Sequence, residues 1–313
     1  MSLTNVLERK SSLATNIDEL SQYIGNTPLF SIKNMVANPR VRIFAKLEWQ
    51  QFGGSVKARP AYEIIYDAIQ QGELTEDKTL VDASSGNTAI AYAHIASRLG
   101  INATICMPEN ASGERKQRIT SLGAEIVYTS ATGSTDEAQE KAASLAKEHP
   151  SKYYYADQYN NPSNWKAHYR NTSREIIEQS EGILTHFITG LGTTGTFTGT
   201  ARGLKEYNEQ ITTIAVQPDM PMHGLEGWKH LETAKIPGIY DHYLPDEHTT
   251  VATENAYETL IKAAQSEGLL LSPSSAANLH AAIRLSEQIE RGTIVTVFPD
   301  DASKYSEILT ELF

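Results

Sequence analysis

The sequence predicts an α/β protein made of two closely packed lobes. Its 313 residues are more than one hydrophobic core usually organises. From Val41 onward, short apolar runs alternate with amphipathic stretches, a pattern typical of parallel strands covered by helices. Because no linker, repeat or break in composition interrupts the alternation, we expect two lobes in intimate contact. We place their boundary near residue 160, giving lobes of 1–160 and 161–313, and expect that the first 45 residues or so can pack on the second lobe.

The expected elements follow in chain order. In the first lobe we expect strands at Val41–Leu47, Thr79–Ala83, Ala103–Cys106 and Glu125–Tyr128. Helices are expected at Pro60–Gln71 and Ala89–Leu99, because Gly72 and Gly100 follow them as helix-ending residues. After a loop at 157–164, the second lobe is expected to contain strands at His186–Thr189, Thr212–Val216 and Thr293–Phe298, with a helix at Asn278–Gln288.

Composition excludes several classes of function. The formal net charge is −11 and no basic cluster offsets it, so we expect no nucleic-acid partner. No apolar run approaches membrane-spanning length and the first twenty residues lack a signal-peptide pattern, which predicts a cytoplasmic protein without a membrane partner. The only cysteine, Cys106, lies in an apolar run, so we expect a buried small side chain and no intrachain disulfide. No histidine shows the spacing of a helical zinc site, and no metal is expected.

Ligands of such sheets bind where strands lead into helices, and four of these loops carry polar side chains. The first, Gly53–Arg59, follows the strand that runs into Glu48. Taken alone it can be a flexible turn with a helix cap. However, Lys57 stands close to the first helical turn, where a desolvated amine loses its proton more readily and can attack a carbonyl.

The second loop, Ser84–Ala89, combines hydroxyls with the N-terminus of a helix. This combination suits an anion such as a carboxylate, although a simple capping turn is equally compatible with these residues. The fourth loop, Leu271–Ala276, stands before the helix at 278–288 and by itself indicates a helix N-cap.

The third loop, Gly190–Thr196, matches the GxGxxG pattern of dinucleotide-binding proteins. An NAD-dependent oxidoreductase is therefore an alternative. In a dinucleotide site an acidic residue should follow the next strand directly, but Val216 is followed by Gln217 and Pro218, and Asp219 comes late. The threonines of the loop suit a single phosphate monoester better.

Together the four loops resemble the cysteine synthase and cystathionine β-synthase family of pyridoxal phosphate (PLP) enzymes, which has the fold called type II. This fold is related to that of the tryptophan synthase β-subunit and holds its active site between two α/β lobes. The resemblance runs from Ile24–Leu29 to about Tyr305. The stretches 157–162 and 192–196 look similar to the bacterial cysteine synthase B branch.

The resemblance implies a role for each site residue. Lys57 would form the Schiff base with PLP and act as the catalytic base. Asn87 would bond the ring oxygen of the cofactor, and Ser274 would face its pyridine nitrogen. The cofactor phosphate would be held by Gly192, Thr193, Thr194, Gly195 and Thr196. The substrate carboxylate would be bound by Ser84, Ser85, Thr88 and Gln158.

The sequence departs from the family pattern at positions that shape the pocket. The family's Asn-Pro before the glycines is Gln51-Phe52 here, and the residue after Lys57 is Ala58 instead of Asp. Glycines of the family are replaced by Ala89 and Ala276, and a Gly-Pro pair by Ser173-Arg174. None of these changes removes a catalytic group, but they leave the preferred substrate open.

The activity that the resemblance implies is β-replacement, forming L-cysteine from O-acetyl-L-serine and sulfide, or another sulfur donor, through an aminoacrylate intermediate. Within the family, O-phosphoserine as donor and homocysteine or an amine as acceptor are alternatives. A phosphoserine site should have a cation near its mouth, and the arginine that such enzymes place after the 216–218 segment is Asp219 here. This difference favours O-acetylserine. The resemblance also implies a homodimer.

Overall fold

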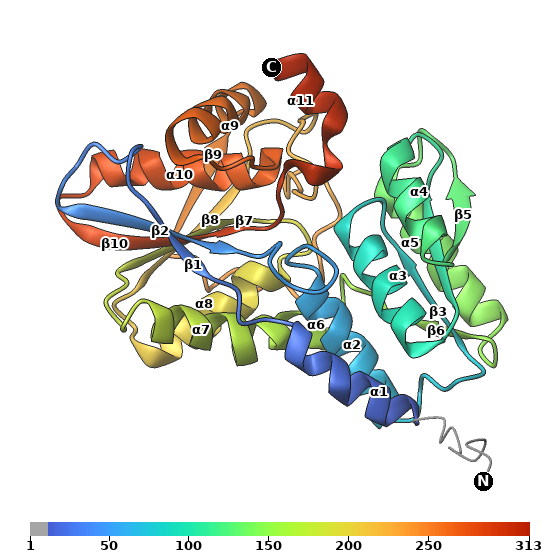
Figure 1. Ribbon diagram of the computed structural model, residues 1–313. Helices are drawn as coiled ribbons and strands as arrows, with labels where there is room; N and C mark the ends of the chain where they lie inside the picture. Colours follow the sequence, from blue (N-terminus) through green and yellow to red (C-terminus); the bar gives the residue numbers. More distant parts are fainter. Residues whose placement is uncertain (1–11) are drawn as a thin grey trace, which may run out of the picture.

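The structure is a computed structural model that describes residues 12–313, and two β-sheets organise it (Figure 1). The larger sheet has the strand order β1-β2-β10-β7-β8-β9, in which only β1 runs antiparallel to its neighbour. Its strands are β1 (Leu29–Ile32), β2 (Val41–Leu47), β7 (His186–Gly190), β8 (Thr212–Pro218), β9 (Glu247–Val251) and β10 (Gly292–Phe298). The smaller sheet is entirely parallel, with the order β5-β4-β3-β6. Its strands are β3 (Thr79–Ala83), β4 (Ala103–Pro108), β5 (Glu125–Thr129) and β6 (Tyr153–Tyr155).

Helices cover both faces of the larger sheet. In Figure 1, α9 and α10 lie on one side of this sheet and α7 and α8 on the other. The bounds are α7 (Ser173–Gln179), α8 (Gly195–Tyr207), α9 (Thr253–Glu267) and α10 (Pro273–Gln288). The core is accordingly divided, with Ile43 and Ile294 facing α10 while Phe187 and Val295 face α8. The chain ends with η3 (Ala302–Lys304) and α11 (Ser306–Leu312).

The smaller sheet is sandwiched in the same way. Helix α5 packs against β3, β4 and β6, whereas α3 and α4 contact the sheet through β3, β4 and β5. Helix α2 packs against α3, and α6 contacts both α2 and α8, so α2 and α6 join the two parts of the molecule. The bounds are α1 (Leu13–Leu20), η1 (Ser21–Tyr23), α2 (Ala58–Gln70), α3 (Asn87–Leu99), α4 (Gly113–Ser121), α5 (Ser134–Glu148), α6 (Pro162–Ala167) and the π-helix η2 (His168–Thr172).

The predicted α/β architecture is confirmed, and the seven strands expected from the sequence all form. Three further strands, β1, β6 and β9, were not expected, because they are short and lack a continuous apolar run. Helix α3 begins at Asn87, two residues earlier than expected. Helix α6 begins inside the expected loop at 157–164 and continues past it, because Asn161 caps it and Pro162 starts it. Cys106 is buried in β4, as expected, and burial raises the pKa of its thiol to about 11.

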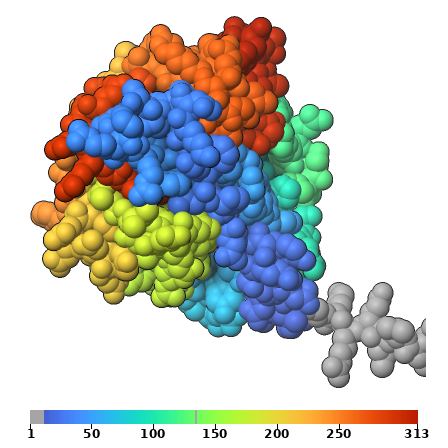
Figure 2. Space-filling view, turned by 60° about the vertical axis from the view of Figure 1, so that its left-hand side comes forward, coloured from blue at the N-terminus to red at the C-terminus, as the bar shows by residue number. Residues whose placement is uncertain are grey.

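The N-terminal strands belong to the larger sheet. Strand β2 lies between β1 and β10, with Val41 opposite Gly292 and Leu47 opposite Phe298. Figure 2 shows the blue N-terminal segment lying directly against red and orange C-terminal residues. We therefore propose two lobes, each built on one sheet, with the chain passing to the smaller lobe after β2 and returning after β6.

Two negative findings apply to residues 12–313. No helix there is long and apolar enough to cross a membrane. In the same residues, no group of three histidine, cysteine or acidic side chains is arranged to hold a metal ion.

Candidate active site

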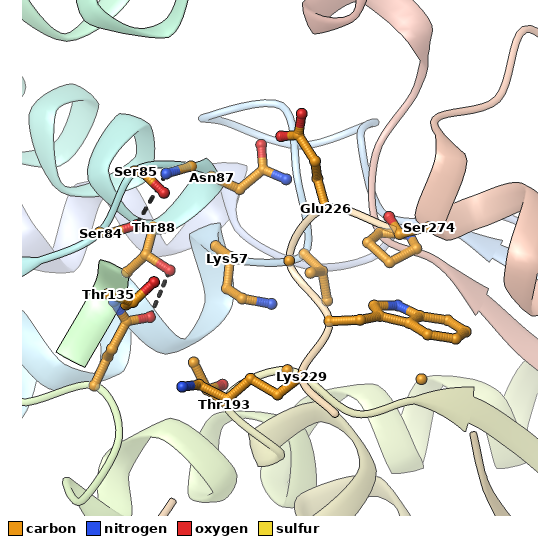
Figure 3. Close-up of a pocket in the computed structure, with 18 of the residues that line it drawn as sticks. Lys57, Ser84, Ser85, Asn87, Thr88, Thr135, Thr193, Glu226, Lys229 and Ser274 are labelled. Atoms are coloured by element: carbon orange, nitrogen blue, oxygen red, sulfur yellow. Dashed lines mark hydrogen bonds between the residues drawn. The ribbon is translucent and has the colours of Figure 1, made fainter. Parts of the chain in front are cut away.

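One cavity of about 400 Å³ brings the four loops together at the carboxyl ends of the strands (Figure 3). The site residues predicted from the sequence that line it are Lys57, Ser84, Ser85, Asn87, Thr88, Gln158, Gly192, Thr193, Thr194, Thr196 and Ser274. Gly195 is the remaining one. It is the first residue of α8 and stands between two lining residues.

Lys57 immediately precedes α2, and its side chain extends into the cavity (Figure 3). Burial lowers the pKa of its amine to about 8, and the nearby carboxylates of Asp300 and Glu48 act in the opposite direction. The main chain beside it is fixed to the larger lobe, because Val56 N donates to Pro299 O at 2.8 Å. A lysine with such a pKa is partly neutral near pH 8, as a nucleophile or a general base requires.

A buried ionic network anchors the start of α2 behind Lys57. The Arg59 guanidinium lies between two carboxylates, with Nε 2.6 Å from Glu48 and Nη1 2.6 Å from Glu175 of α7. Lys46 of β2 also contacts Glu175, at 2.7 Å. Burial alone would raise the pKa of both carboxyls, but the attraction of Arg59 holds each pKa below its usual value. Strand β2, α2 and α7 are thus joined directly behind the catalytic candidate.

The turn before α3 both caps that helix and lines the cavity. Ser84 Oγ accepts hydrogen bonds from Gly86 N at 3.2 Å and Ala89 N at 3.3 Å, so this hydroxyl is engaged in the turn. Thr88 Oγ1 donates to Gln158 Oε1 at 2.7 Å, and the Gln158 amide in turn donates to the end of β3. The ligand-binding and capping interpretations of this turn are therefore compatible, because its backbone forms a wall of the cavity.

The loop that leads into α8 forms a second wall of the cavity, and its geometry suits an anion. Thr194 has φ +70°, a strained conformation for a β-branched residue, and among the described residues its buried Oγ1 has no hydrogen-bond partner. A side chain at Gly192 would overlap the carbonyl oxygen of Gly227, so the main chain approaches closely here. The first N–H groups of α8 have no partner inside the helix. These groups provide the donors that a phosphate monoester needs.

Of the three neighbouring serines at the start of α10, Ser274 is the one that lines the cavity. Ser272 is the N-cap and accepts from Ser275 N at 3.2 Å. Ser275 Oγ donates to the main-chain oxygen of Asp300 at 2.6 Å. Ser274 Oγ also lies 3.2 Å from Ser272 Oγ, so it is its place in the cavity wall that favours Ser274 as the ligand-facing serine.

Charged residues at the cavity mouth were missed by the sequence analysis. Arg115 of α4 forms an ion pair with Glu226, and Lys229 lies 3.7 Å from Asp136. From the sequence, position 219 was the one place where a cation for a phosphoserine substrate was looked for, and this position does not line the cavity. In the sequence, isolated charges in polar helices and in the irregular segment 219–246 look like those of surface residues. No sequence pattern therefore indicated that these four charged residues lie at the cavity. Each cation at the mouth is accompanied by a carboxylate.

The family model described as "Pyridoxal-phosphate dependent enzyme" matches residues 20–300. A cysteine synthase of Aquifex aeolicus is 43% identical over 95% of this chain and 92% of its own length. An O-acetylserine dependent cystathionine β-synthase of Bacillus subtilis is 36% identical, over 93% of this chain and 96% of its own. The solved structure of a cysteine synthase (OASS) of Entamoeba histolytica has a TM-score of 0.87 and 31% identity, covering 94% of this chain and 90% of that one.

Proposed function

The chain belongs to the family of pyridoxal-phosphate dependent enzymes, and on that premise we propose that it is a cysteine synthase, forming L-cysteine from O-acetyl-L-serine and sulfide. It has the type II fold of these enzymes and uses PLP. The observation that carries the proposal is that one cavity joins a partly neutral lysine to two helix N-termini suited to anions. A cysteine synthase has two anionic groups to hold there, the cofactor phosphate and the substrate carboxylate.

The residues around the cavity fit this cofactor. Gly192 lets the main chain approach closely, and the Thr194 hydroxyl has no hydrogen-bond partner among residues 12–313, so polar groups remain for a phosphate at the start of α8. Lys57 would hold the cofactor covalently, Asn87 would bond its ring oxygen, and Ser274 would face its ring nitrogen. A serine hydroxyl is a neutral partner, so it does not stabilise a protonated ring as a carboxylate would.

The chain's own residues account for the remaining steps. Bound PLP supplies the electron delocalisation that lets an amino acid lose its α-proton near neutral pH. The turn before α3 and Gln158 orient the substrate through its carboxylate. Lys57 Nζ, released when the substrate amine binds, takes the α-proton and later returns it. With PLP bound, the β-substituent would leave with its bonding electrons and sulfide would add to the same carbon, next to the Lys57 side chain.

Two related substrates deserve comparison with O-acetylserine and sulfide. O-Phosphoserine would bring a doubly charged leaving group to a mouth where Arg115 and Lys229 are already accompanied by Glu226 and Asp136, so we expect it to be the poorer donor. Homocysteine is a candidate acceptor besides sulfide. Its carboxylate could face the cation, and its ammonium the carboxylate, of the Arg115–Glu226 or Lys229–Asp136 pair. The Bacillus relative is named for cystathionine formation, which supports testing it. The family match does not support the NAD-dependent alternative.

The experiment that tests the proposal is a panel of donors and acceptors with the purified protein. We expect the protein to be yellow, to lose its colour with borohydride, and to make cysteine fastest from O-acetylserine and sulfide. Homocysteine in place of sulfide tests cystathionine formation. A colourless protein, or one that makes no cysteine from any donor, would contradict the assignment.

Replacing Gly192 with alanine should weaken cofactor binding. The new Cβ would overlap the Gly227 carbonyl, so the loop must move away from the phosphate position, and we expect the Kd for PLP to rise at least tenfold, or about 1.4 kcal/mol. Fluorescence titration of the cofactor-free protein measures this. The matched control is Gly113→Ala, where the added Cβ meets no atom within 4 Å and affinity should not change. Equal affinities of the two variants would contradict a phosphate site at this loop.

A cytoplasmic homodimer is also part of the proposal. Its support is the family resemblance together with the acidic composition and the single, buried cysteine. Sedimentation at micromolar protein concentration measures the oligomeric state, and a monomer there would contradict it.

A further inference from the structure

Asp300 is a fully buried carboxylate beside the cavity that the sequence analysis did not identify. It follows β10, and its neighbour Pro299 lines the cavity. The Asp300 main chain is fixed from the side of α10 by the Ser275 hydroxyl, while Val56 next to Lys57 donates to Pro299. The residue therefore stands where the Lys57 loop and the start of α10 meet.

The Asp300 side chain reaches across to the smaller lobe. Its Oδ2 accepts from Asn87 Nδ2 at 2.9 Å and from Tyr305 Oη at 2.9 Å, and Lys304 Nζ lies 3.4 Å away. An ionised carboxylate only accepts hydrogen bonds, so the amide nitrogen of Asn87, and not its oxygen, must face Asp300. One N–H of that amide is thereby used, and the second remains to donate to a ligand. The other carboxylate oxygen, Oδ1, is buried and has no hydrogen-bond partner among residues 12–313.

Asp300 also acts electrostatically on Lys57. Burial is the largest influence on the Lys57 pKa and lowers it, whereas Asp300 and, less strongly, Glu48 raise it. The charged and titratable groups that face Asp300 itself are Lys304 and Tyr305, in contact with it, and Arg115, which interacts through space. The negative charge of the Asp300 carboxylate acts on Lys57, and its oxygen Oδ2 accepts from Asn87.

We propose that Asp300 is a positioning residue that fixes the orientation of the Asn87 amide towards the cofactor and places a negative charge beside the loop that carries Lys57. This inference rests on the proposed function, since it assigns Asn87 and Lys57 to the cofactor. The Asp300 side chain thus contributes in two separate ways. The hydrogen bond to Asn87 needs an acceptor oxygen, whereas the effect on Lys57 needs a negative charge.

Two substitutions separate these contributions. Asp300→Asn keeps an acceptor oxygen for Asn87 and the shape of the side chain but removes the charge, and Asp300→Ala removes both. Asp301→Asn is the matched control: Asp301 is the next residue, its side chain caps Ser303 N at 3.1 Å, and an asparagine can do the same. Thermal unfolding of each full-length variant checks that it folds.

The first measurement is the pH dependence of Lys57 labelling by an acylating reagent in the full-length protein freed of cofactor, followed by mass spectrometry. The wild-type midpoint should lie near pH 8. In both Asp300 variants the labelling midpoint should move down by about one pH unit. This is the lower end of the pKa change that a neighbouring opposite charge causes. The second measurement is the Kd for PLP, which should stay near the wild-type value in Asp300→Asn and rise roughly tenfold or more in Asp300→Ala. Asp301→Asn should match the wild type in both.

The outcomes are distinguishable from a failure of the proposed function. If the wild-type protein does not bind PLP at all, the function is wrong. If it binds PLP but the labelling midpoint of Asp300→Asn equals that of the wild type, the electrostatic role of Asp300 is refuted. An unchanged Kd in Asp300→Ala would likewise refute its role in orienting Asn87.

Discussion

Replacing Lys57 with alanine should lower cysteine formation by roughly four orders of magnitude or more, because the same amine would hold the cofactor and move the α-proton. Lys57 lines the cavity and its side chain extends into it, and its pKa of about 8 suits both tasks. The cofactor's visible absorbance should change, since the covalent link is lost. Steady-state rates with O-acetylserine and sulfide, together with a spectrum, measure both effects.

The control for this variant is Lys262→Ala, an exposed lysine of α9 whose side chain is 66% exposed. It should keep wild-type turnover. Adding a small primary amine such as methylamine to Lys57→Ala should restore part of the activity, which a purely structural lysine would not allow. Normal turnover of Lys57→Ala without added amine would overturn the assignment of the whole site.

Replacing Arg59 with methionine should reduce the free energy of unfolding by about 3–5 kcal/mol. The substitution leaves Glu48 and Glu175 buried without the cation that lies between them, while Lys46 still contacts Glu175. Urea unfolding followed by circular dichroism measures the change. The loss of stability should become smaller in acid, because the pKa values of Glu48 and Glu175 are lowered in the folded protein. The stabilisation that these two carboxylates give is fully present above their unfolded-state pKa and is lost as the pH falls through their folded-state pKa.

A surface ion pair provides the comparison for Arg59. Arg98 and Glu19 lie 3.4 Å apart with about half of each side chain exposed, so Arg98→Met should cost about 1 kcal/mol or less. If Arg59→Met is no more destabilising than this control, the buried network does not hold α2 in place. A loss of stability with unchanged PLP affinity would show that the network supports the lobe but not the position of Lys57.

Local patterns in the sequence were sufficient to predict the loops of the site. The loops at 53–59, 84–89 and 190–196 were each identified because they follow a predicted strand, and the family resemblance implied one site for them; all three line one cavity. The resemblance assigned Ser274 to the cofactor, and the structure adds that Ser274, and neither Ser272 nor Ser275, lines the cavity.

Long-range contacts could not be predicted in this way. Asp300 and Asn87 are separated by 213 residues, and Arg59 and Glu175 by 116. Nothing in the local pattern around Asp300 distinguishes it from the exposed acidic residues of other turns. The pairing of β2 with β10 could not be predicted for the same reason. The hydrophobic pattern of a strand shows that the strand is buried but not which strand lies beside it.

That pairing has a consequence for how the protein is made. All four strands of the smaller sheet come from residues 79–155, so this lobe can begin to fold while the rest of the chain is still being synthesised. The larger sheet cannot form at that stage, because β2 pairs with β10, which lies about 250 residues later in the chain. Until the ribosome has released the last strand, β2 keeps an open, hydrophobic edge. Newly made chains are therefore expected to depend on chaperones chiefly for their N-terminal strands.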